Sequence, residues 1–141
     1  MKNKEVVINY LNKERNKIYN QILNVCKEAS KGENIISVEY LNSLYNLHLK
    51  AKIYIDTQKL EGANLQHQIN IREDNLELIY NTVSEKAGKD NAKKIVKLYN
   101  DLAEKDEDIF MVQNSGFFKR LKILNKVRSQ MKANEEMVLE K

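Results

Sequence analysis

The sequence of 141 residues has no proline and only four glycines, namely Gly32, Gly62, Gly88 and Gly116. Proline ends or kinks a helix because it lacks an amide donor and clashes with the preceding turn. Glycine is therefore the main helix breaker left in this chain. Between the glycines, apolar residues recur three, four or seven positions apart, which is helical spacing. The sequence predicts an all-α protein, an antiparallel bundle of long helices.

Cysteine and long apolar runs are also scarce. Cys26 is the only cysteine, which excludes an internal disulfide and a zinc site built from cysteines. No window approaches the roughly 18 apolar residues of a membrane span, and the apolar residues 6–8 are too few for a signal peptide. The net charge of +4 is modest. We therefore expect one cytoplasmic domain over residues 1–141, without membrane association.

Four helices are predicted, separated at Gly32, Gly88 and Gly116. The first ends before Gly32, and Ser37 is a suitable N-cap for the second. Residues from about 134 are expected to fray, because chain ends are commonly poorly ordered. The first two predicted helices span about residues 3–30 and 38–87. Asp90 can cap the third, which ends at the turn 114–116, and the fourth covers residues 117–132, followed by the tail 134–141.

Two seven-residue series run through the second predicted helix and pass Gly62 without a change of phase. The first series is Leu41, His48, Ile55, Gly62, Ile69, Leu76 and Val83, and the second is Leu44, Ala51, Gln58, Leu65, Arg72 and Ile79. This continuity favours one helix over residues 38–87, about 75 Å long. The alternative is a bend at Gly62, which would give five helices.

Several polar residues and one glycine interrupt this apolar seam. In coiled coils, such interruptions reduce stability and specify register or partner. Another backbone can approach closely at a glycine. We therefore predict a partner-binding seam, and the alternative is a loosely amphipathic helix with a seam partly open to water. The seam residues are His48, Ile55, Gln58, Gly62 and Arg72.

The last predicted helix, residues 117–132, is basic. A basic amphipathic helix is typical of nucleic-acid or acidic-partner binding. The alternative is a solvated face paired with the acidic cluster just upstream, Asp101, Glu104, Asp106, Glu107 and Asp108. The basic residues are Lys119, Arg120, Lys122, Lys126, Arg128 and Lys132, with no acidic residue among them.

No arrangement of residues indicates chemistry. The residues three positions before His48 and His67 are Tyr45 and Asn64, so the Glu-x-x-His pattern of di-iron bundles is missing. No phosphate-binding glycine loop and no nucleophile–base pattern is present. We therefore expect a protein that is not an enzyme and that has no cofactor and no metal site.

These observations favour a non-catalytic helical protein–protein interaction protein, such as a regulator, inhibitor, small subunit or chaperone. We expect a protein partner, a homodimer, or both, through helical faces. The alternative is nucleic-acid binding by the basic helix 117–132. Lysine outnumbers arginine by 20 to 4, as in AT-rich genomes, and this composition is compatible with a phage or another mobile element.

Overall fold

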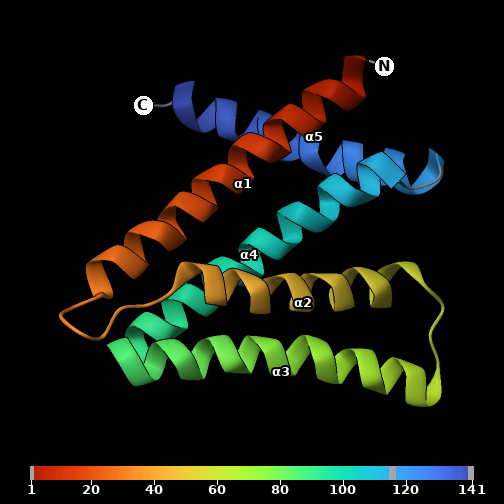
Figure 1. Ribbon diagram of the computed structural model, residues 1–141. Helices are drawn as coiled ribbons and strands as arrows, with labels where there is room; N and C mark the ends of the chain where they lie inside the picture. The colour runs from red at the N-terminus through yellow and green to blue at the C-terminus, as the bar shows by residue number, and fades with distance from the viewer. Residues whose placement is uncertain (1, 115–116, 140–141) are drawn as a thin grey trace. The chain divides into compact units, whose positions relative to one another are not determined.

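The computed structural model describes the backbone of residues 2–114 and 117–139, and the side chains of residues 4–114 and 122–134. In this part of the chain it has five helices and no strand (Figure 1). None of these helices is both long enough and apolar enough to cross a membrane. The all-α prediction is confirmed. The helices are α1 (Lys2–Ala29), α2 (Val38–Thr57), α3 (Gly62–Ala87), α4 (Lys89–Asn114) and α5 (Phe117–Leu139).

The prediction of one continuous helix over residues 38–87 is wrong, and the alternative with five helices is correct. Helix α2 ends at Thr57, and both Gln58 and Glu61 have extended backbone. Gly62 then opens α3 with a φ of 58°, a left-handed conformation that favours glycine. The chain reverses here, so the apolar faces of α2 and α3 pack against each other instead of forming one long exposed seam.

Local signals set the other helix boundaries. Ser37 caps α2 as predicted, because its side chain accepts a hydrogen bond from the amide of Tyr40 at 3.2 Å. Gly32, in the turn after α1, and Gly88, between α3 and α4, both have positive φ. Helix α5 continues to Leu139, past residue 134 where fraying is predicted. Gly116 lies outside the described residues.

The chain divides into two compact units. Unit 1 comprises residues 1–17 and 104–141, and unit 2 comprises residues 18–103. Each unit has its own apolar core. That residues 1–141 form one domain stays a prediction. The core of unit 1 comes from α1, α4 and α5 and contains Val7, Leu11, Val112, Leu124 and Val127.

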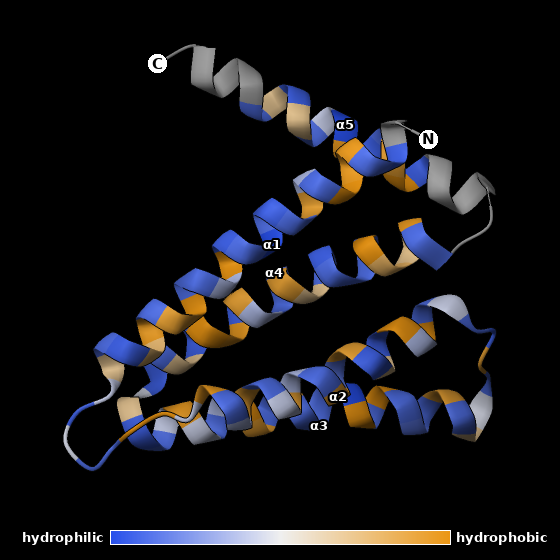
Figure 2. Ribbon diagram, turned by 45° about the horizontal axis from the view of Figure 1, so that its top comes forward, coloured by the Kyte–Doolittle hydropathy of each residue, from blue (hydrophilic) through white to orange (hydrophobic). Residues whose placement is uncertain are grey.

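In unit 2, the antiparallel hairpin of α2 and α3 packs against the end of α1 and the beginning of α4. The rings of Tyr45 and Tyr99 stack with their centroids 5.1 Å apart. Asn42 joins three helices, because it donates to the hydroxyl of Tyr19 at 2.9 Å and accepts from the hydroxyl of Tyr99 at 2.8 Å. These contacts define the side of the hairpin that faces α1 and α4. Figure 2 shows hydrophobic residues recurring along both helices of the hairpin.

Candidate protein-interaction surface

The predicted seam does not form one exposed surface. His48 is only 3% exposed and lies inside the hairpin, where its Nδ1 is 2.8 Å from the carbonyl oxygen of Arg72. Ile55 is partly buried, whereas Gln58 and Gly62 are exposed at the turn. The side chain of Arg72 is partly exposed and forms an ion pair with Glu73 at 3.6 Å. Reversal of the chain after α2 brings His48 beside the backbone of Arg72 inside the hairpin and leaves Gln58 and Gly62 at the exposed turn.

The environment of His48 favours the neutral imidazole. Burial lowers its pKa, and the positive charges of Arg72 and Lys52 lower it further, against the opposing effect of the hydrogen bond to the Arg72 backbone. His48 Nε2 is buried and has no hydrogen-bond partner. His48 is therefore a core histidine, and no group of three metal-ligating side chains occurs among the described residues.

A second apolar stripe on α2 remains exposed. Tyr40, Leu47 and Tyr54 are 45%, 51% and 46% exposed, which is high for large hydrophobic side chains. They follow one another at seven-residue intervals, and residues seven apart lie on the same side of a helix. The stripe therefore runs along the whole of α2.

This stripe lies on the side of the hairpin turned away from α1 and α4. Tyr40 precedes Asn42 by two residues, which is a rotation of about 200° around the helix, and Asn42 bonds to α1 and α4. On α3, Leu78 is 45% exposed. In sequence it is two residues from both Leu76 and Tyr80, which pack against the core, so it lies about 200° around the helix from each of them. Leu78 therefore points away from that core, as Tyr40 does.

Ile71, seven residues before Leu78, is partly exposed on the same side of α3. The apolar surface that α2 and α3 present together is called the outer face below. Sequence reasoning missed the stripe on α2, although a signal was present, since each residue of the stripe directly precedes a member of the first seam series. The outer face consists of Tyr40, Leu47, Tyr54, Ile71 and Leu78.

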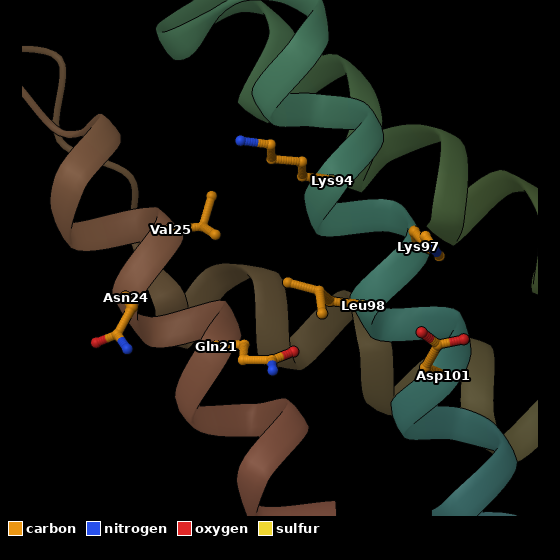
Figure 3. A pocket seen from close by; sticks show the side chains of 7 residues that line it. All are labelled: Gln21, Asn24, Val25, Lys94, Lys97, Leu98 and Asp101. Carbon is orange, nitrogen blue, oxygen red and sulfur yellow. The ribbon is translucent and has the colours of Figure 1, made fainter. Parts of the chain in front are cut away.

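A shallow groove of about 440 Å³ runs between α1 and α4 in unit 2. Leu98 and Lys94 extend from α4 toward α1 across it (Figure 3). Its polar side chains are exposed, and none of them bonds to another described residue. The lining offers apolar contact and both signs of charge, but neither a histidine nor a thiol. The lining residues are Gln21, Asn24, Val25, Lys94, Lys97, Leu98 and Asp101.

The basic helix is partly neutralised inside unit 1. Lys126 forms ion pairs with Glu104 at 3.2 Å and Asp108 at 3.0 Å. Burial alone would lower the pKa of Lys126, but its bonds with Asp108 and Glu104 outweigh that effect and raise it. Pairing of the acidic cluster with this helix is confirmed at Lys126. The acidic cluster also contacts α1, where Arg15 bonds to Asp106.

The structure describes the side chains of three other predicted basic residues of α5. Lys122, Arg128 and Lys132 are exposed and form no ion pair with any residue whose side chain is described. The side chains of Lys119 and Arg120 lie outside the described residues.

Cys26 is buried in the core of unit 2. Burial raises the pKa of its thiol to about 11, which disfavours the reactive thiolate.

Comparison with models of protein families, with curated proteins and with solved structures found no match to this chain.

Proposed function

We propose that this chain is a non-catalytic helical interaction protein that binds protein through its outer face. One observation carries the proposal: Tyr40, Leu47, Tyr54 and Leu78, all large and apolar, are each 45–51% exposed on one side of one hairpin. Scattered exposed hydrophobic residues are normal, but a contiguous apolar patch is typical of a protein-binding surface. In this role the protein acts in the cytoplasm as a regulator, inhibitor, small subunit or chaperone.

The shape of the outer face favours a helical partner. The stripe on α2 has the seven-residue spacing with which side chains of one helix pack between those of another. Tyrosine suits such a surface because its ring is apolar and its hydroxyl tolerates water before binding. Tyrosine is also enriched among the residues that dominate binding energy.

The proposal is tested with immobilised protein. We measure which proteins it retains from a lysate of the cells it comes from, and whether it retains free copies of the same chain. Leu47→Lys places a charge in the middle of the stripe and should abolish retention of the specific partner. Phe110→Lys is the matched control, because Phe110 is another exposed hydrophobic residue, 38% exposed, in unit 1. If both variants retain what the wild type retains, the outer face is not the binding surface.

The exposed cations of α5 favour a second candidate function, which is nucleic-acid binding. Lys122, Arg128 and Lys132 are exposed, whereas Leu124 and Val127 of the same helix are buried. Such binding should weaken steeply with salt, because each neutralised phosphate releases counterions. Replacing the three cations by glutamate should abolish binding of a duplex or a single strand at low salt. Wild-type protein that binds neither nucleic acid at low salt would exclude this function.

A further inference from the structure

We propose that the outer face binds the outer face of a second copy of this chain, in an antiparallel dimer with Leu47 on the two-fold axis. This inference rests on the proposed function, because it names the partner of the same surface. It comes from the arrangement of the exposed apolar residues, which on α2 is symmetric about Leu47 and on α3 lies on both sides of the same level of the hairpin.

The stripe on α2 is symmetric about Leu47. Tyr40 and Tyr54 each lie seven residues from Leu47, or about 10 Å along the helix axis on either side. A two-fold axis that passes through Leu47 at a right angle to α2 makes the second copy of α2 antiparallel to the first. Leu47 then meets Leu47 of the second copy, and each Tyr40 meets the Tyr54 of the other copy.

The register of the hairpin gives α3 the same centre. The bond from His48 to the carbonyl oxygen of Arg72 places these residues at one level, and the bond from Lys86 to the carbonyl oxygen of Ile35 agrees with that register. Because the helices are antiparallel, Leu47 lies at the level of residues 73 and 74.

The apolar residues of α3 flank this level. Ile71 lies two to three residues before this level, and Leu78 lies four to five residues after it. The axis that pairs Leu47 with itself therefore places Leu78 of one copy within about one helical turn of Ile71 of the other. Two-fold interfaces use the same patch on both subunits and require this kind of self-complementarity, whereas a different partner requires no such symmetry.

The outer face is also large enough for a dimer. Helix α2 has 20 residues, which is about 30 Å of helix, and two packed helices are about 20 Å wide. The contact would cover about 600 Å² on each copy, or about 1,200 Å² in total, which is the lower limit for a stable specific interface. Four α-helices would then enclose the exposed tyrosines and leucines, as in a four-helix bundle.

The first test is the mass of the whole chain in solution, measured by light scattering after size-exclusion chromatography over a range of concentrations. The wild type should have twice the chain mass of 16.5 kDa, and Leu47→Lys should halve it, because two like charges then meet at the axis. Tyr54→Lys should weaken the dimer, and Phe110→Lys should leave it intact. Circular dichroism should show that each variant stays helical.

The second test locates the axis by cross-linking. Leu47→Cys should form a disulfide-linked dimer with oxidised glutathione, because a residue on the axis lies beside its own copy. Asn46→Cys, exposed on another side of α2, should not. Cys26 should not contribute, since it is buried and the pKa of its thiol is raised to about 11.

Three results would overturn the dimer: a monomeric wild type at every concentration, a dimeric and folded Leu47→Lys variant, or equal cross-linking at Leu47→Cys and Asn46→Cys. These results are distinct from failure of the proposed function. A monomeric wild type whose binding to another protein depends on Leu47 overturns only the dimer. A monomeric wild type whose partners are all retained by Leu47→Lys overturns both.

Discussion

His48 Nδ1 on α2 lies 2.8 Å from the carbonyl oxygen of Arg72 on α3, inside the hairpin. A carbonyl oxygen only accepts hydrogen bonds, so Nδ1 carries the proton and Nε2 is an unprotonated acceptor. Nε2 is buried without a partner, and protonating it would place a charge in the core near Arg72 and Lys52. The native hairpin therefore favours a neutral His48.

We expect acid to destabilise the protein through His48. Its pKa is lowered in the native state, so below the unfolded value of about 6.5 the unfolded chain binds a proton more readily than the native chain does. The free energy of unfolding should be constant above that pH and fall as the pH drops below it. The fall is at most about 1.4 kcal/mol per pH unit for one group. Urea denaturation at pH values between 8 and 5 measures it.

The matched control replaces the other histidine. His48→Asn keeps an amide donor for the Arg72 carbonyl but does not titrate, so it should flatten the dependence between pH 7.5 and 5.5. His67→Asn, at an exposed position, should leave the wild-type slope unchanged. An unchanged slope in His48→Asn would show that other groups cause the acid sensitivity.

The bonds of Asn42 predict a stability effect in unit 2. Tyr99 is completely buried, and its hydroxyl donates to Asn42. Asn42→Ala leaves that hydroxyl without its acceptor in the core, which should lower the free energy of unfolding by about 1–3 kcal/mol. Asn46→Ala on the exposed side of α2 should change it by less than about 0.5 kcal/mol. Urea denaturation compares the two variants.

A double substitution separates the lost hydrogen bond from other effects at Asn42. Tyr99→Phe removes the hydroxyl itself, so Asn42→Ala should cost less in a Tyr99→Phe background than in the wild type. Additive costs of the two substitutions would contradict the assigned bond.

In unit 1, Lys126 should matter more for stability than the other described cations of α5. Lys126→Gln leaves the largely buried carboxylate of Asp108 without its ion pair, which should cost about 1–3 kcal/mol. Lys122→Gln, at an exposed position, should cost less than about 0.5 kcal/mol. Thermal and urea unfolding measure both variants, and equal costs would show that the ion pairs of Lys126 do not stabilise the unit.

The apolar spacing predicted the helices and their buried faces but not the reversal between α2 and α3. Leu41 and His48 from one end of the seam, and Ile79 and Val83 from the other, are all buried. The two helices use this face to pack against each other, so the seven-residue series shows the same phase on both sides of the turn. The turn itself, residues 58–61, contains neither proline nor glycine. Gly62 was the only local signal for this turn. The reversal of the chain was determined by packing between residues that are distant in sequence.

The interaction surface was harder to predict for a related reason. Tyr40, Leu47 and Tyr54 have helical spacing, as their buried neighbours Leu41 and His48 do. Spacing alone does not show which of two adjacent apolar stripes on a helix is buried against the other helices of the chain. That depends on where α1 and α4 pack, through contacts such as those of Asn42 with Tyr19 and Tyr99.

Gly62→Ala distinguishes the hairpin from a continuous helix by the sign of its effect. In the middle of a helix, alanine in place of glycine stabilises by about 1 kcal/mol. In the hairpin, Gly62 has a φ of 58°, where a side chain strains the backbone by about 1–3 kcal/mol. No atom lies within 4 Å of the position that a Cβ would take, so backbone strain alone decides the outcome. We therefore expect Gly62→Ala to lower the free energy of unfolding.

Asparagine provides the control at this turn, because it adopts the left-handed conformation more readily than alanine does. Gly62→Asn should therefore cost less than Gly62→Ala, whereas in a continuous helix asparagine would be the worse helix former of the two. Urea denaturation of the two variants gives their order. A higher free energy of unfolding for Gly62→Ala than for both Gly62→Asn and the wild type would mean that α2 and α3 form one helix. The outer face would then not exist in this form.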